Sequence, residues 1–230
     1  MPPLSQAPLV RNRSRRGGPR PGSGPKPKGA KAGVSHRTRA ATAASYPAHV
    51  TVKLQRLLPL LRRPREYATL RKCFAKGCDR MGFRLIHYAV LNEHMHFLVE
   101  ARDRTALTRG VQGLLIRIAK ALNKLWCRKG KVFFDRYHDR ILKSTRDVRN
   151  VLRYVLQNGK KHAAQGRKVK VPGPIDMYTS APWFDGFVEV IRVAGLEALV
   201  RPVTDARTWM LTEGWRRHGL IGVHELPRTG

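Results

Sequence analysis

Strand-like and helix-like runs alternate along the sequence in the order β-α-β-β-α-β, which predicts an α+β fold of the ferredoxin-like type. In that fold an antiparallel sheet carries its helices on one face. Two of the strands are separated by only a short turn, so we expect them to be antiparallel neighbours. The 230 residues are 42% hydrophobic, which is enough for one packed core.

The first half of this pattern is a strand, a helix and a second strand. Residues 49–54 alternate with β-branched side chains and predict the first strand. Residues 66–81, which follow Pro64, carry apolar side chains at helical spacing, and Gly82 ends the predicted helix. Residues 83–90 predict the second strand.

The second half continues through a tight turn at Asn92-Glu93 into a third strand, residues 94–100. Residues 105–127 carry a long apolar stripe with basic residues on the other faces, which predicts a helix. Residues 131–143 then predict an extended basic strand or loop that completes the unit.

A further helix follows the unit. Ser144 or Thr145 can cap it, and apolar side chains at helical spacing form its buried face. Tyr154 and Asn158 lie in one row beside that face, because they are four residues apart. We expect the helix to end near residues 159–162.

Composition divides the chain into three regions. Residues 1–45 are rich in Pro, Gly, Ser and Arg and predict a disordered basic arm, since such a segment buries too little apolar surface to offset its ordering entropy. Residues 46–164 hold all the predicted elements and form the expected folded domain. Residues 165–230 show a weaker pattern and predict a partly ordered C-terminal extension.

The charge balance indicates a polyanionic partner. The chain has 46 Lys and Arg against 15 Asp and Glu, a net charge of +31, and its first acidic residue is Glu66. Nucleic acid is the expected partner, ahead of an acidic membrane surface. Within the arm, Arg20, Lys26 and Lys28 alternate with Pro and Gly and are candidate minor-groove contacts, with a generic electrostatic tail as the alternative.

Three further observations favour a cytoplasmic protein. No apolar run approaches the roughly 20 residues that are needed to span a bilayer. The N-terminus has charges but lacks the apolar segment of a secretory signal. The three cysteines cannot form a disulfide framework.

The candidate chemistry begins with His94-Met95-His96 on the third predicted strand. Side chains on a strand alternate between faces, so the two imidazoles point the same way while Met95 points into the core. About 7 Å apart along the strand, the imidazoles can converge on one divalent metal. The alternative is that both are polar residues on the solvated face of a half-buried strand.

Together with residues 133–139 and the helix segment Arg153-Tyr154-Val155-Leu156-Gln157-Asn158, the histidine pair makes residues 46–162 resemble the HUH single-tyrosine transposases. The resemblance is to the REP-associated tyrosine transposase branch, which is IS200-like. It implies a ferredoxin-like catalytic domain with an added tyrosine helix, acting in the nucleoid of a prokaryotic-type cell as a monomer or homodimer. It also implies that single-stranded DNA is cut at or near hairpins through a 5′-phosphotyrosine intermediate.

On the matching positions, the resemblance implies that Tyr154 is the nucleophile. His94, His96 and the amide oxygen of Asn158 would bind Mg²⁺ or Mn²⁺. The chain departs from the family pattern in having Glu93 before the histidine pair and no proline after the asparagine. Five basic residues are candidate DNA contacts, namely Arg136, His138, Arg140, Lys160 and Lys161.

Three other histidines, His49, His87 and His162, are expected to be structural or surface residues. Two alternatives to the transposase function remain open. One is a basic DNA- or RNA-binding protein that keeps the scaffold without catalysis. The other is a relative of replication initiators or relaxases with the same chemistry, although the chain has little room for the extra domains that these proteins carry.

Overall fold

An antiparallel sheet of five strands organises the part of the chain that the structure, a computed structural model, describes: residues 42–166 and 169–227. The strands lie in the order β2-β3-β4-β1-β5. Apart from the short β2, this order and the antiparallel pairing are those of a ferredoxin-like unit, which confirms the predicted fold class. The strands are β1 Ala48–Lys53, β2 Asp79–Arg80, β3 Phe83–Val90, β4 His94–Ala101 and β5 His138–Ile141.

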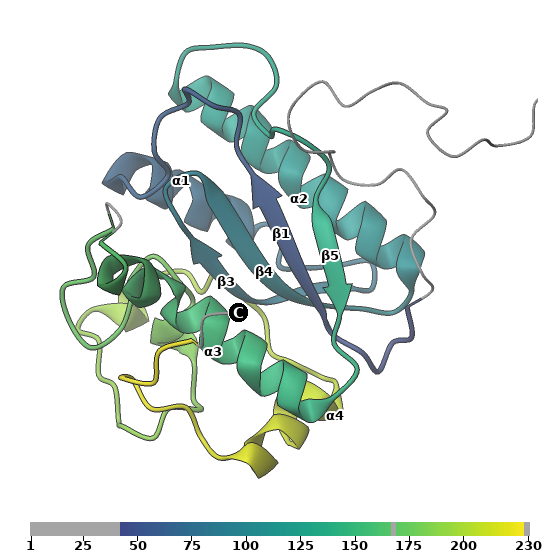
Figure 1. Cartoon of the computed structure of the whole chain (residues 1–230). Helices are drawn as coiled ribbons and strands as arrows, with labels where there is room; N and C mark the ends of the chain where they lie inside the picture. The colour runs from purple at the N-terminus through teal and green to yellow at the C-terminus, as the bar shows by residue number, and fades with distance from the viewer. Residues whose placement is uncertain (1–41, 167–168, 228–230) are drawn as a thin grey trace, which may run out of the picture. The chain divides into compact units, whose positions relative to one another are not determined.

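Helices cover both faces of the sheet (Figure 1). Helices α1 (Pro64–Ala75) and α2 (Arg104–Leu125) pack on one face, as expected for the two helices of the unit. Helix α3 (Thr145–Ala164) packs on the other face, where it contacts β3 and β4. In the described part of the chain, no helix combines the length and the apolar character that crossing a membrane would require.

Each face of the sheet has its own hydrophobic core, and β4 contributes side chains to both cores because successive residues point to opposite faces. Met95, Phe97 and Val99 are buried against α1 and α2, whereas Leu98 is buried against α3. His96 therefore lies on the α3 side, as strand alternation predicts. The face that receives α3 is thus the face on which the histidine pair is displayed.

Helix α1 is shorter than the predicted 66–81, because the chain turns back to form β2. Met81 and Gly82 have φ values of +49° and +80°, and they join β2 to β3 as a two-residue hairpin turn. A helix cannot include backbone of that hand. At the other end of the domain, α3 runs past the expected stop near residues 159–162 to Ala164.

Residues 169–227 pack against α3 and also against the sheet beside it, where Ser180 N donates to Tyr88 O and Thr204 N to Leu85 O of β3. They contain the short helices η1 (Ala181–Trp183), η2 (Leu196–Ala198), α4 (Trp209–Thr212) and η3 (Gly214–His218). Trp215 fills the interface with α3 and is 1% exposed. Glu225 accepts hydrogen bonds from Arg149 and Arg153 of α3, at 2.8 and 2.6 Å. The extension therefore holds α3 on the sheet.

His87, on β3, is buried beneath this extension. Its Nδ1 lies 3.0 Å from Ser180 Oγ, and its ring meets Phe184 edge-on. Burial is the main cause that lowers the pKa of His87 from 6.5 to about 4, and the charge of Arg201 lowers it further against the opposing effect of Asp185. His87 is therefore neutral in the folded protein at neutral pH.

We expect acid to destabilise the fold partly through His87. Between about pH 6.5 and 4 the unfolded state binds the proton and the folded state does not, so stability falls as the pH falls. At about pH 4.5 the loss from this group amounts to roughly 2–3 kcal/mol. Denaturant titrations near pH 7 and 4.5 measure it, and His87→Gln should lose less stability between the two pH values than the wild type. Equal losses would contradict this account.

Candidate active site

Tyr154 of α3 and His96 of β4 meet on the α3 face of the sheet. The phenol Oη lies 3.4 Å from His96 Nε2, and the two rings are nearly perpendicular with centroids 5.0 Å apart. His94 stands beside His96, with ring centroids also 5.0 Å apart. The structure therefore brings together three of the residues that the sequence singled out.

His96 is held from its other side by β1. Its Nδ1 lies 3.1 Å from Thr51 Oγ1 and 3.2 Å from His49 Nε2. Thr51 is the direct cross-strand partner of His96 in the antiparallel register. If Nδ1–H donates to Thr51, Nε2 keeps its lone pair and directs it toward Tyr154.

The pKa of His96 lies well below its usual 6.5, because the ring is buried and because His49 and His94 stand close by. The imidazole is therefore neutral near pH 7. A neutral imidazole with a free nitrogen lone pair can bind a metal or accept a proton, which a charged imidazolium cannot do.

Two histidines that were expected to be structural or surface residues also line this site. His49 lies with its ring centroid 5.2 Å from that of His96 and 5.8 Å from that of Tyr154. Burial, with smaller contributions from Arg140 and His138, lowers the pKa of His49 to about 4. His162 is buried, with its ring centroid 5.8 Å from that of His94. The sequence did contain a signal for His162, because it lies four residues after Asn158 on the same helix. The position of His49, in contrast, depends on strand register.

Asn158 lies one helical turn beyond Tyr154 and is fully buried. Neither its Oδ1 nor its Nδ2 has a hydrogen-bond partner among the described residues. A buried amide without partners costs about 1–3 kcal/mol, so such a group commonly serves a ligand. Neighbouring Gln157, by contrast, donates through Nε2 to Gly222 O at 2.6 Å.

The donor atoms of His94, His96 and Asn158 are of the kinds that bind a divalent metal. Two imidazoles and one amide oxygen with open positions suit Mn²⁺ or Mg²⁺ better than a closed zinc site. Within residues 42–166 and 169–227, no group of three or more His, Cys, Asp and Glu side chains is placed to hold a metal. The Asn158 oxygen would therefore have to complete the set.

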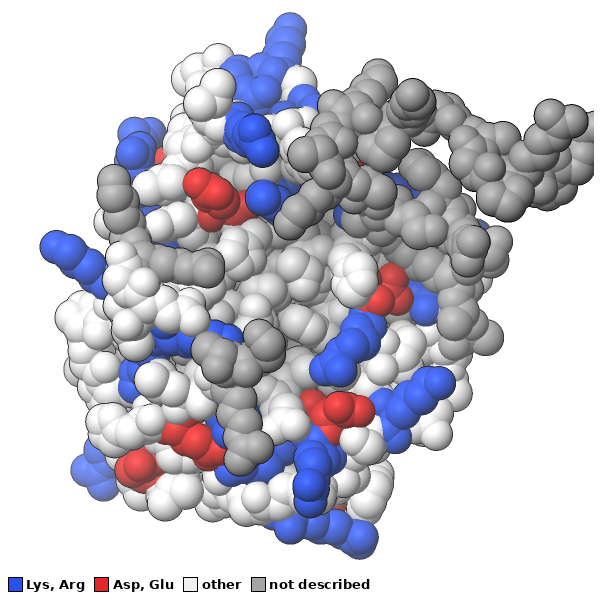
Figure 2. Space-filling model, viewed as in Figure 1, with Lys and Arg blue, Asp and Glu red and all other residues white. Residues whose placement is uncertain are grey.

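Two of the candidate DNA contacts flank the site on β5. Arg140 and His138 pair with His49 and Thr51 in the antiparallel register, so they share the sheet face of the active site. Both side chains are exposed, as is Arg136 just before β5. Figure 2, drawn from the α3 side, shows Lys and Arg at several places around the margin of this face, with acidic side chains beside some of them.

The remaining candidate cations behave differently from one another. Lys161 Nζ lies 5.7 Å from the ring centroid of Tyr154, the predicted nucleophile. The Lys160 ammonium instead donates to Pro174 O and, at 2.6 Å, to Val223 O, which ties it to the C-terminal extension. Arg20, Lys26 and Lys28 lie outside the described residues.

Comparison with known proteins identifies the domain. The model of the family described as "Transposase IS200 like" matches residues 46–158. Among solved structures, the chain is similar to a REP-associated tyrosine transposase bound to a REP hairpin, with a TM-score of 0.45 and 22% identity over 56% of this chain and 74% of that chain. It is also similar to a candidate transposase from Deinococcus radiodurans R1, with a TM-score of 0.38 and 12% identity over 58% of this chain and 98% of that chain. No curated protein matches.

The sequence match covers the whole unit from β1 to Asn158, including His94, His96 and Tyr154. The expected resemblance is thereby confirmed. Residues 46–158 are a domain of the IS200-like transposase family, and the chain is an HUH-type transposase.

Proposed function

We propose that the chain cuts and rejoins single-stranded DNA at or near hairpins, with Tyr154 as the nucleophile and a divalent metal as the cofactor. The observation that carries this proposal is the 3.4 Å approach of Tyr154 Oη to His96 Nε2. It brings the phenol to His96, one of the proposed metal ligands, within one chain. One chain therefore supplies both of these groups, and a homodimer is compatible with this arrangement.

His94, His96 and Asn158 would hold the Mg²⁺ or Mn²⁺ ion. When bound, the ion supplies Lewis acidity that polarises the scissile phosphate. This help is needed because a phenol, with an ordinary pKa near 10, is a weak nucleophile at neutral pH. Thr51 and His49 would fix the orientation and tautomer of His96 from behind.

The proposed reaction exchanges one phosphodiester bond for another. Tyr154 Oη bonds to phosphorus and gives up its proton to solvent, while the bond from phosphorus to the 3′ oxygen breaks and that oxygen takes up a proton. The products are a 5′-phosphotyrosine and a free 3′-OH. Because the bond energy is conserved in the phosphotyrosine, a 3′-OH can attack it and rejoin strands without ATP.

The DNA strand would reach the site along β5. Arg136, His138 and Arg140 lie in or just before β5, and Lys161 lies near the Tyr154 ring, so their side chains can contact phosphates of such a strand. Arg20, Lys26 and Lys28 of the arm remain predicted contacts. We propose that the protein acts on DNA in the nucleoid of the cytoplasm.

One observation favours a second candidate function, which is DNA binding without catalysis. No three His, Cys, Asp or Glu side chains of the described residues converge on a metal position. A non-catalytic protein would bind DNA without a metal, and replacing His94 and His96 with Ala would leave that binding unchanged.

Incubation with a pool of single-stranded hairpins tests the proposal. We expect a covalent protein–DNA adduct with Mn²⁺ or Mg²⁺, which denaturing electrophoresis detects and sequencing of the attached DNA maps. EDTA, or the His94→Ala/His96→Ala variant, should lower the adduct by at least about 100-fold. A wild-type protein that binds the hairpins but forms no adduct with either metal would support the second function instead.

A further inference from the structure

A basic concavity lies on the sheet face that α1 and α2 cover. Its volume is about 600 Å³, and it opens between the β2–β3 turn and the first half of α2. Phe83, which lines it, pairs with Ala101 at the end of β4, whereas His94 and His96 stand at the beginning of that strand. The concavity is therefore separate from the Tyr154 site. We call it the arginine groove, after Arg80, Arg102, Arg109 and Arg117.

The four guanidinium groups of the groove carry more charge than their surroundings neutralise. Within residues 42–166 and 169–227, the only carboxylate that pairs with any of them is Asp103, 3.2 Å from Arg102. Asp103 is also the N-cap of α2, where it accepts a hydrogen bond from Ala106 N. Four neighbouring cations with so little compensation favour an anionic occupant.

Two glycines keep the floor of the groove open. Gly110 is required by packing, since an added Cβ would lie 2.1 Å from the Phe83 ring. Packing does not require glycine at position 113, because an added Cβ there would meet nothing within 4 Å. Glycine is the poorest helix former apart from proline, and yet Gly113 lies in the middle of a 22-residue helix. Its missing side chain leaves space above α2 for a flat group.

We propose that the arginine groove binds an unpaired stretch of the DNA strand on which Tyr154 acts. Phosphates would contact the guanidinium groups, which match phosphate oxygens in a bidentate way, and a base would lie over the glycine floor between them. The volume is that of a small-ligand site, which suits single nucleotides and not a duplex. The proposal rests on the proposed function only for the choice of DNA as the nucleic acid.

Fluorescence anisotropy with the full chain and a fluorescein-labelled oligothymidylate of roughly 16 nucleotides tests the groove. The measurements are made in EDTA over a series of salt concentrations, so that no strand is cut. Arg109→Ala/Arg117→Ala removes two groove cations, and Gly113→Leu fills the floor without a change of charge. Arg65→Ala/Lys72→Ala, on the exposed side of α1, is the matched control.

The arginine variant should bind at least about tenfold more weakly, with the slope of log K against log salt reduced by about 1.4, or 0.7 for each lost phosphate contact. Gly113→Leu should bind about fivefold more weakly with an unchanged slope, and the α1 control should change much less. Equal losses in the arginine and control variants, or wild-type affinity in Gly113→Leu, would overturn the proposal. The hairpin adduct of the wild type decides the proposed function separately.

Discussion

Replacing Tyr154 with phenylalanine is expected to abolish the covalent adduct with hairpin DNA while leaving DNA binding within about twofold of the wild type. The substitution removes only the hydroxyl that lies 3.4 Å from His96 Nε2. The ring, its edge-on contact with His96 and the packing of α3 all remain. Loss of a nucleophile without loss of binding separates the chemical step from recognition, and we expect at least about a 10³-fold fall in adduct.

The matched control is Tyr178→Phe, which removes a phenolic hydroxyl outside the site while the ring keeps its contact with Tyr67. This variant should form adduct at the wild-type level. If Tyr154→Phe formed adduct in a yield similar to that of the wild type, the nucleophile would be another residue. Peptide mapping of the wild-type adduct, with the nucleotide attached to the peptide that contains Tyr154, is the direct confirmation.

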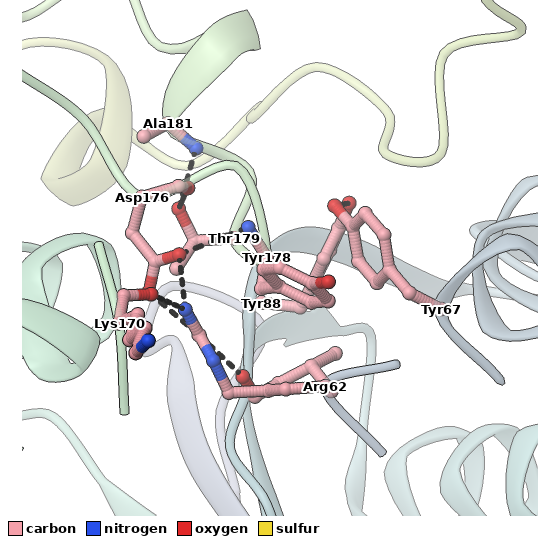
Figure 3. A network of polar contacts seen from close by, with 9 residues as sticks. Arg62, Tyr67, Tyr88, Lys170, Asp176, Tyr178, Thr179 and Ala181 are labelled. Carbon is pink, nitrogen blue, oxygen red and sulfur yellow. Dashed lines mark hydrogen bonds and ion pairs between the residues drawn. The ribbon is translucent and has the colours of Figure 1, made fainter. Parts of the chain in front are cut away.

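A second large effect is expected at the buried ion pair of Arg62 and Asp176 (Figure 3). Their side chains are 5% and 1% exposed, and two hydrogen bonds of 2.8 and 2.9 Å join them. Arg62 also donates to Val90 O at the end of β3 and lies over the Tyr178 ring. On α3, Gly159 makes room for Asp176, since an added Cβ would come 1.9 Å from Oδ2. The pair therefore joins the C-terminal extension to the sheet beside α3.

Arg62→Ala should destabilise the protein by roughly 3–5 kcal/mol, because it leaves the Asp176 carboxylate buried without its cation. Denaturant titration and thermal melting measure the loss. The comparison variant is Arg201→Ala, which breaks an exposed ion pair with Asp205 and should cost less than about 1 kcal/mol. Similar small losses in the two variants would mean that the Arg62 pair does not anchor the extension.

The strands and the long helices could be predicted because their signals are local. The alternation of β4 placed His94 and His96 on one face and Met95 in the core before any contact was known. The Ser144 cap, which accepts a hydrogen bond from Asp147 N, is likewise a short-range feature. The end of α1 was missed because the strained Met81-Gly82 turn that replaces it depends on strand pairing.

The candidate site was predictable only in part. Tyr154 and Asn158 could be placed on one helical row, but nothing in their spacing says what that row contacts. The contributions of His49 and Thr51 were not predicted, because they arise from the register that sets β1 against β4. Lys160, which the sequence offers as a DNA contact, donates to carbonyls of a segment that folds back from beyond residue 170.

By itself the sequence determined which side chains share a face: two imidazoles on a strand, and a phenol and an amide on a helix. Only the tertiary structure decided that these two faces meet, with residues 96 and 154 brought within 3.4 Å. The physical reason is that periodicity comes from the local backbone geometry of each element. The docking of α3, in contrast, depends on its burial between the sheet and residues 169–227 and on the Arg62–Asp176 pair, which joins positions 114 residues apart.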